Sequence, residues 1–242
     1  MKTAVVTGGT KGIGRAVTEM LLARKWHVIT NYAHDSYAAD IMSRQAAERW
    51  PEAKLDITEA DQSQREGTYR LIDFIRNLTQ KVDCIVCNAG ITVRKPFTET
   101  SDTDWDAMME TAVNSHYILI RELFPIIPRD SRILFTGSLM AIHPHATVTG
   151  YGVTKSAVHA LARNLVKEFE GTGTTVNTIA PGFVETEWQL GKPETVRRNI
   201  CSKTASGRFA TVEEVADAFR FCLDNAFVNG SVIEVSGGYS FK

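Results

Sequence analysis

The sequence predicts an α/β protein with one doubly wound parallel sheet of about seven strands and helices on both faces. Short apolar runs alternate with longer helical patterns along the whole chain, which is typical of repeated β-α-β units. Several of these runs are apolar throughout, as expected of strands that helices cover on both faces. No repeat, low-complexity tract or proline- and glycine-rich linker divides the 242 residues, so we expect a single domain spanning 1–242.

Seven apolar runs are expected to form the strands of this sheet. Each is short, as strands in compact domains usually are. They span residues 3–7, 28–31, 53–57, 82–87, 132–136, 174–179 and 232–235.

Helical patterns fill the intervals between the expected strands. Thr211 and Glu214 have the spacing of a capping box, and Ser101 is an N-cap candidate followed by acidic residues in the first turn. Both features predict where a helix begins. The patterns span residues 12–24, 36–49, 62–79, 102–123, 152–169 and 212–223.

The stretch from 183 to 207 does not follow the alternation. It contains no strong strand and only a short possible helix at 193–201. Such long connections in compact domains are often lids or binding loops. We therefore interpret 183–207 as a flap that faces the substrate, with an irregular surface excursion as the alternative.

The charge balance excludes several classes of partner. The chain has 27 Lys and Arg against 28 Asp and Glu, so it lacks the basic excess that nucleic acids or anionic membranes usually require.

No apolar run approaches the roughly 18 residues of a membrane span. The N-terminal residues lead straight into the first strand and leave no room for a signal peptide, which predicts a cytoplasmic protein.

The four cysteines, at positions 84, 87, 201 and 222, are too few and too irregularly spaced for a disulfide framework. Cys84 and Cys87 form a C-x-x-C pattern, which could be a redox pair or half of a zinc site. Because they are three residues apart on an expected strand, their side chains should point to opposite faces. We interpret them as two small buried residues and predict no metal site.

A glycine-rich turn, TGGTKGIG at residues 7–14, follows the first strand directly and opens a helix. The glycines at 8, 12 and 14 allow a tight turn and a close approach of the backbone to a pyrophosphate, which the amides at the helix N-terminus would bind. The strand before the turn and the helix after it strengthen this interpretation.

Tyr151 and Lys155 lie four residues apart in a helical pattern, so both side chains should share one helical face. An ammonium close to the phenol favours the phenolate, and we therefore expect a lowered pKa for Tyr151 and a role as general acid. Ser138 follows the strand 132–136 at the edge where open α/β sheets bind ligands, and its hydroxyl could hold a carbonyl oxygen.

Taken together, these features resemble the short-chain dehydrogenase/reductase family in order and spacing across essentially the whole chain. The motifs that carry the resemblance are the glycine turn, Asn88-Ala89-Gly90, Asn114, Ser138, Tyr151-x-x-x-Lys155 and Pro181-Gly182. The resemblance implies a Rossmann-like fold. Among the subgroups, the chain looks most like the 3-oxoacyl-[acyl-carrier-protein] reductases, through VITNYA at 28–33, TGS at 136–138, APGFVET at 180–186 and GRF at 207–209.

The resemblance also implies the catalytic roles. Tyr151 would give a proton to a carbonyl oxygen while a nicotinamide delivers hydride to the carbon, and Lys155 would lower the tyrosine pKa and bind the nicotinamide ribose. Ser138 would orient and polarise the carbonyl, and Asn114 would anchor a water that connects Lys155 to solvent. Each role uses donor chemistry that the side chain has.

The family's cofactor contacts map onto further positions. Asn88-Ala89-Gly90 would border the adenosine half and tie adjacent backbone together, Asp56 would meet the adenine, and Val184 and Thr186 would contact the nicotinamide amide. The complete set that the resemblance implies is Gly8, Thr10, Lys11, Gly12, Ile13, Gly14, Asn31, Asp56, Asn88, Ala89, Gly90, Tyr151, Lys155, Pro181, Gly182, Val184 and Thr186.

The residues after the second strand bear on the choice between cofactors. An NAD site usually has an acid there for the ribose 2′-hydroxyl, but this chain has Asn31-Tyr32-Ala33 and no acid before Asp35. Lys11 stands where NADP-dependent relatives have a basic residue and could pair with a 2′-phosphate, with Arg15 as a second helper. We predict NADP(H) over NAD(H).

The substrate is less constrained. A 3-oxoacyl thioester on an acyl carrier protein, as in fatty acid biosynthesis, is expected from the resemblance, and Arg129 could meet the acidic carrier, although the turn 170–173 lacks a second basic residue. The loop histidines His143 and His145 could face the substrate. An alcohol, sugar or steroid dehydrogenase working toward oxidation is the alternative, and a non-catalytic nucleotide-binding regulator is a further one that the intact catalytic set disfavours.

The resemblance implies a homotetramer in which helical segments 102–123 and 152–169 pack against a partner. The apolar side chains that could make these contacts, or could equally face the chain's own sheet, are Leu119, Leu123, Leu161 and Leu165.

Overall fold

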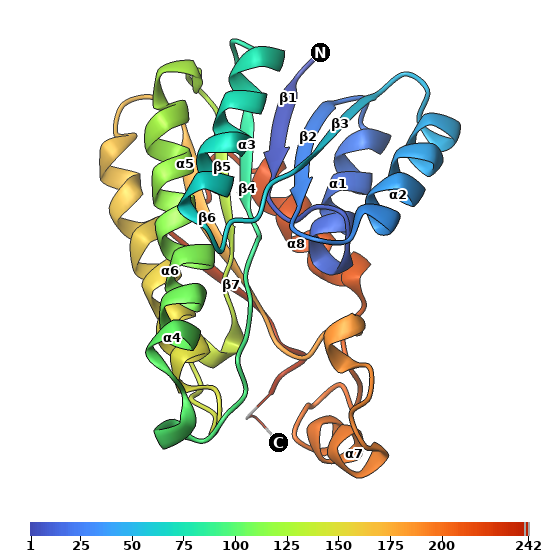
Figure 1. Cartoon of the computed structure of the whole chain (residues 1–242), viewed down its shortest axis with the longest axis vertical. Coiled ribbons are helices and arrows are strands. Elements are labelled where there is room, and N and C mark those ends of the chain that lie inside the picture. Colours follow the sequence, from blue (N-terminus) through green and yellow to red (C-terminus); the bar gives the residue numbers. More distant parts are fainter. Residues whose placement is uncertain (240, 242) are drawn as a thin grey trace.

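The computed structural model of the chain, which describes residues 1–239 and 241, is built on one seven-stranded parallel sheet. The strand order β3-β2-β1-β4-β5-β6-β7 confirms the predicted doubly wound sheet (Figure 1). All seven expected strands are present, each within a few residues of its predicted bounds. They are β1 (Thr3–Val6), β2 (His27–Tyr32), β3 (Lys54–Glu59), β4 (Cys84–Cys87), β5 (Arg132–Thr136), β6 (Thr175–Pro181) and β7 (Val232–Val235).

Helices cover both faces of the sheet (Figure 1). One apolar core lies beneath α1 (Gly12–Ala23), α2 (Ser36–Arg49) and α8 (Val212–Asp224). The second core lies beneath α3 (Arg65–Leu78), α5 (Ser115–Leu123) and α6 (Thr149–Glu168), with α4 (Asp102–Met109) preceding α5. This arrangement explains why the central strands are apolar on both sides.

The capping predictions are confirmed. Ser101 and Thr211 both form capping boxes, with Asp104 and Glu214 as the reciprocal partners. The expected helix 102–123 is interrupted, because a π-helical turn, Glu110–Asn114, separates α4 from α5. Such turns widen a helix locally and are frequent at functional sites.

The segment 183–207, expected to be a flap, has little regular secondary structure. It contains a 3-10 turn at Glu187–Gln189 and the short helix α7 (Glu194–Ser202), and Val184 forms an isolated bridge with Ala210 at its base. In Figure 1 this segment extends beyond the carboxyl ends of the strands.

Buried apolar residues explain two further features of the sequence. Cys84 and Cys87 are free and buried, and they belong to the two different cores, so the C-x-x-C pair spans the sheet as predicted. Leu119 and Leu123 are fully buried and Leu161 and Leu165 pack against the same core, so these leucines face the chain's own sheet.

Among the residues that the structure describes, no helix is long and apolar enough to span a bilayer.

Candidate active site

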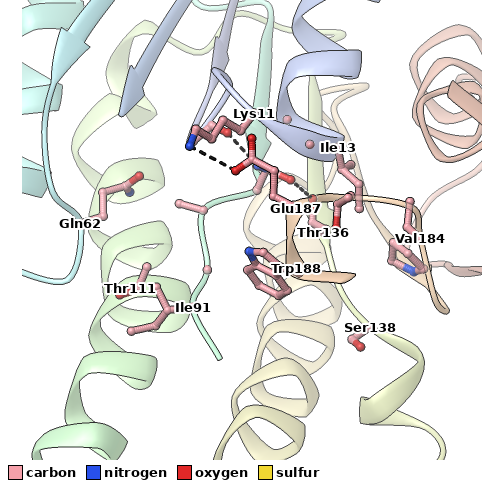
Figure 2. A pocket seen from close by; sticks show the side chains of 18 of the residues that line it. Lys11, Ile13, Gln62, Ile91, Thr111, Thr136, Ser138, Val184, Glu187 and Trp188 are labelled. Carbon is pink, nitrogen blue, oxygen red and sulfur yellow. Dashed lines mark hydrogen bonds and ion pairs between the residues drawn. The ribbon is translucent and has the colours of Figure 1, made fainter. Parts of the chain in front are cut away.

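A cavity lies at the carboxyl ends of the strands, where the order of the strands reverses: β2 and β3 follow β1 on one side, and the chain then crosses back to β4 on the other side of β1. Crevices at such reversal points are where open α/β sheets bind ligands. The cavity has a volume of about 310 Å³ and is lined by the glycine turn, the loops after β2, β3, β4, β5 and β6, and the start of α6. Figure 2 shows Ser138 and Trp188 toward one end of it and Lys11 toward the other.

The glycine turn has the conformation that close approach of a ligand requires. Gly8 and Gly12 have φ angles of +62° and +52°, in the left-handed region that favours glycine. A Cβ on Gly14 would lie 2.3 Å from the carbonyl oxygen of Gly8 and 2.5 Å from Asn88 Nδ2. No side chain caps the N-terminus of α1, so its first amides remain available. The turn therefore fits a pyrophosphate group.

Asn31 and Asn88 hold this turn in place. The amide N–H of Gly8 donates to Asn31 Oδ1 at 3.1 Å, and Asn31 Nδ2 donates to the Ala60 carbonyl at 2.7 Å. Asn88 Nδ2 donates to the Thr7 carbonyl at 3.0 Å, while its Oδ1 accepts from Thr136 Oγ1 at 3.0 Å. Asn88 thus ties the ends of β1, β4 and β5 together, which is the backbone tie expected of the Asn-Ala-Gly motif.

Ser138, Tyr151 and Lys155 meet at the other end of the cavity. Lys155 Nζ lies 5.8 Å from the centroid of the Tyr151 ring and donates to the Thr136 carbonyl at 2.7 Å. Ser138 Oγ accepts from the Met140 amide at 3.1 Å, which fixes the serine at the start of a 3-10 turn. The i, i+4 spacing on α6 therefore brings the phenol and the ammonium into one cavity, as expected.

The pKa values of this pair correct one expectation. Burial raises the pKa of Tyr151 to about 12, opposed by its interaction with the Ser138 hydroxyl. Burial also lowers the pKa of Lys155 to about 8. The expected lowered pKa of Tyr151 is therefore not found in this structure, because desolvation of the phenol dominates, and the Lys155 ammonium donates to the Thr136 carbonyl.

Asn114 ends the π-helical turn and lies behind the cavity wall. Its Nδ2 donates to Glu110 Oε2 at 2.6 Å, and Glu110 in turn pairs with Arg65 at 3.1 Å. Thr111, in the same turn, lines the cavity, whereas Asn114 does not. The side chain of Asn114 is thus committed to the helix that carries it.

Two expected cofactor residues lie outside the cavity. Asp56 pairs with His27 at 2.6 Å and with Lys54 at 2.9 Å, and β3 continues past it to Glu59. Asp56 does not line the cavity because the strand runs two residues longer than predicted, and Asp61 and Gln62 line it instead; the adenine contact of Asp56 stays a prediction. Thr10 is also absent from the cavity wall, because it is buried and lines a neighbouring hollow.

The remaining expected cofactor residues all line the cavity. They are Gly8, Lys11, Gly12, Ile13, Gly14, Asn31, Asn88, Ala89, Gly90, Tyr151, Lys155, Pro181, Gly182, Val184 and Thr186.

The flap contributes residues that the sequence did not single out. Trp188 stands edge-on to the Tyr151 ring, with centroids 6.2 Å apart and planes at 71°. Glu187 Oε2 lies 3.1 Å from Lys11 Nζ, which Figure 2 shows as a contact between the flap and the glycine turn. A flap facing the cavity was predicted, but these individual contacts depend on its folded path and have no signal in the sequence.

Arg129 and the loop histidines do not have the expected positions. Arg129 precedes β5, so it lies at the amino edge of the sheet, opposite Ser138, and donates to the Gly171 carbonyl at 2.6 Å. His145 bonds to Tyr239 Oη at 3.0 Å, and neither it nor His143 lines the cavity. Arg129 therefore does not lie beside the cavity of its own chain, where a contact with the acidic carrier was expected.

Comparison with known proteins agrees with this geometry. The short chain dehydrogenase family model matches residues 2–196. The chain is 30% identical to the 3-oxoacyl-[acyl-carrier-protein] reductase of Haemophilus influenzae, over 98% of this chain and 97% of that protein. It is also 30% identical to the 2-dehydro-3-deoxy-D-gluconate 5-dehydrogenase of Pseudoalteromonas atlantica, over 98% and 95%.

Among solved structures, a blue fluorescent protein from a metagenomic library, in complex with NADPH, has a TM-score of 0.93 at 25% identity. The match covers 99% of this chain and 98% of that one. Family model, relatives and fold therefore agree, and the chain belongs to the short-chain dehydrogenase/reductase family of oxidoreductases.

Proposed function

We propose that the protein is an NADP(H)-dependent carbonyl reductase in which Tyr151 is the proton donor to a ketone. The observation that supports this most directly is the meeting of Ser138, Tyr151 and Lys155 in one cavity with the glycine turn. A nicotinamide bound there would supply the hydride.

Tyr151, Ser138 and Lys155 have different roles in this proposal. With a pKa of about 12, Tyr151 keeps its proton at neutral pH and is present in the form that can donate to a carbonyl oxygen. The Ser138 hydroxyl is a second donor at the same end of the cavity. Lys155, whose pKa is about 8, remains mainly an ammonium at pH 7 and would stabilise negative charge that develops on the phenol oxygen.

Asn114 has a positioning role in this proposal. Through Glu110 it fixes the π-helical turn that carries Thr111 into the cavity wall. The family's water relay through Asn114 stays a prediction.

The preference for NADP(H) over NAD(H) rests on Lys11, the cation of the glycine turn that lines the cavity. A 2′-phosphate would find a charged donor there, and no acid stands at residues 31–33 to repel it. The complex of a structural neighbour with NADPH is consistent with this choice.

For the substrate, we propose a 3-oxoacyl thioester, supported by the similarity to 3-oxoacyl-[acyl-carrier-protein] reductases. Lys192, on the flap, donates to the Trp188 carbonyl at 3.2 Å, and the positive charges of Arg94 and Arg197 contribute to lowering its pKa, after burial. Arg197 is itself paired with Glu185 at 2.6 Å, so Lys192 and Arg94 are the cations here that would suit a substrate with an anionic carrier group. Oxidation of a sugar acid is the alternative, favoured by the similarity to a gluconate dehydrogenase.

A homotetramer and a role in fatty acid biosynthesis are parts of the same proposal. The predicted leucines face inward, but Trp105, Tyr117 and Phe124 are exposed by 38%, 49% and 46% on the helical segment 102–126. These aromatic side chains could contact a partner subunit. A cytoplasmic location stays a prediction, consistent with four free cysteines.

The test is NADPH oxidation with a panel of 3-oxoacyl thioesters and small ketones, and NADP⁺ or NAD⁺ reduction with sugar acids, in which products are identified. We expect Tyr151→Phe to retain NADPH binding and to lose at least about a hundredfold in kcat, because the ring stays and the proton donor is lost. Turnover of Tyr151→Phe at the parental rate would show that Tyr151 is not the acid.

A further inference from the structure

His159 is a buried histidine that the proposed reaction does not use. It lies on α6, one turn after Lys155 and two turns after Tyr151, so the three side chains follow one face of the helix. Only 6% of its surface is exposed, and it does not line the cavity. A buried imidazole behind two side chains of the candidate site is in a position to hold a third residue in place.

The imidazole bonds to the backbone of Ser138. His159 Nε2 accepts from the Ser138 amide at 3.3 Å, and within residues 1–239 and 241 this is the one hydrogen bond of that amide. Ser138 lies two residues beyond the end of β5, where the ladder with β6 no longer supplies an acceptor. Because Ser138 is itself 6% exposed, its N–H would be buried and unpaired without His159, which is unfavourable.

Gly137 allows the imidazole to come this close. A Cβ on Gly137 would overlap His159 Nε2 and would lie 2.6 Å from Thr178 Cγ2, so no larger residue fits between the ring and the backbone. The φ angle of Gly137 is not positive, so the site uses the missing side chain rather than the backbone freedom of glycine. The glycine before Ser138 is thus matched to the histidine on α6.

Two side chains of α6 hold the segment that carries Ser138. Lys155 Nζ donates to the Thr136 carbonyl at 2.7 Å. One turn further along the helix, His159 accepts from the Ser138 amide. Because Tyr151 lies on the same helix, the position of the serine hydroxyl relative to the phenol is set through α6.

We propose that His159 is a positioning residue for the reaction: by accepting from the Ser138 amide, it holds the serine hydroxyl where Ser138 and Tyr151 can donate to the same carbonyl oxygen. This inference rests on the proposed function, in which Ser138 is a donor to the ketone. The bond requires a free electron pair at Nε2, so the ring proton belongs at Nδ1. Burial, and then the positive charges of Lys155 and Arg163, lower the pKa of His159 to about 4, so the ring is neutral at pH 7.

His159→Leu and His159→Gln separate the hydrogen-bond acceptor from the volume of the side chain. Both replacements are close to histidine in size, but only glutamine offers an oxygen that can accept from the Ser138 amide. The assay is NADPH oxidation with acetoacetyl-coenzyme A, a 3-oxoacyl thioester, and with ethyl acetoacetate, a small 3-oxo ester. We expect kcat to fall about tenfold in His159→Leu, because a small misplacement of a donor lowers turnover strongly, and to stay within about threefold in His159→Gln.

A double-mutant cycle with Ser138→Ala distinguishes positioning of the serine from a general structural role. If His159 acts through the serine hydroxyl, the loss caused by His159→Leu should largely disappear once that hydroxyl is gone. The matched control is Val158→Ala, a fully buried neighbour on α6 that packs in the apolar core. It should lower the free energy of unfolding in urea and leave kcat unchanged.

Two measurements test the inference without turnover. The Ser138 amide should exchange with deuterium faster in His159→Leu than in the wild type, because its hydrogen bond is lost. The Kd of NADPH, measured by calorimetry, should change by less than about twofold in both His159 variants, because the proposal places Ser138 against the ketone and not the cofactor. A larger loss of NADPH binding in His159→Leu would show a general structural role and would overturn the inference.

The remaining outcomes separate this inference from the proposed function. Turnover of His159→Leu at the parental rate, an equal loss in His159→Gln, or a loss that is the same with and without the Ser138 hydroxyl would each refute the positioning role and leave the proposed function intact. If the wild type reduces neither ketone with NADPH, both are wrong.

Discussion

Lys155 is a buried ionisable residue, and burial disfavours its charged form. Substitution of Lys155 should therefore change how the free energy of unfolding depends on pH. Its side chain is almost completely buried, with 2% of its surface exposed, and its pKa falls from 10.5 to about 8. At 1.36 kcal/mol per unit, this shift corresponds to about 3 kcal/mol of unfavourable free energy for the folded state at pH 7. Burial is the principal cause.

The sign follows from proton binding. Between pH 8 and 10.5 the unfolded chain still binds this proton while the folded protein has released it, so the free energy of unfolding rises with pH. Below pH 8 both states bind it and the full cost remains. From pH 7 to pH 9, the contribution of Lys155 should therefore become less unfavourable by about 1 kcal/mol.

Lys155→Met removes this titration and retains a side chain of similar length. We expect the stability of the wild type relative to this variant to increase by about 1 kcal/mol between pH 7 and pH 9, measured by urea unfolding at several pH values. The matched control is Lys167→Met in the same helix, whose 78% exposed ammonium stays largely in water on folding. A difference between wild type and Lys155→Met that does not vary with pH would refute the argument.

Two further predictions concern buried side chains. Under native conditions a thiol reagent should label Cys201 and leave Cys84, Cys87 and Cys222 unmodified, because burial raises the pKa values of these three thiols. Mass spectrometry of the labelled protein shows which cysteines have reacted. His116 is fully buried with a pKa of about 3, so below pH 6.5 only the unfolded chain binds its proton, and the free energy of unfolding falls as the pH falls. His116→Gln should reduce the loss of unfolding free energy between pH 6 and pH 5 by about 1 kcal/mol, measured by urea unfolding. An equal loss in both proteins would contradict this.

The fold could be predicted because its signals are local. Apolar runs such as 132–136 need only their own composition to be recognised as strands, and Ser101 and Thr211 cap their helices through residues three positions away. The π-helical turn Glu110–Asn114 had no such signal. It extends a helical pattern that is continuous in the sequence.

The candidate site could be predicted where spacing alone determines geometry. Tyr151 and Lys155 share a helical face because they are four residues apart, and this required no knowledge of the rest of the chain. The direction of the tyrosine pKa depends on what covers the phenol and on where the ammonium donates. The ammonium donates to the Thr136 carbonyl, and Trp188 packs edge-on against the phenol ring. Both residues are distant in sequence from Tyr151 and Lys155.

Asp56 shows how a small error in a strand boundary moves a site residue. The prediction ended this strand at residue 57, so Asp56 stood close to the ligand-binding edge, but in the structure β3 ends at Glu59. In parallel register Asp56 lies opposite Ile29, well before the end of β2. Because strand ends are set by pairing with neighbours, composition alone cannot fix them to the residue.

Two features that cost local stability adjoin the cavity, and this supports a function there without reference to any relative. A buried ammonium at Lys155 and an interrupted helix at Glu110–Asn114 both work against stability. Away from the cavity, helix caps and apolar cores follow the ordinary rules. Local stability is commonly given up at functional sites, so a buried ammonium and an interrupted helix beside one cavity are consistent with chemistry there.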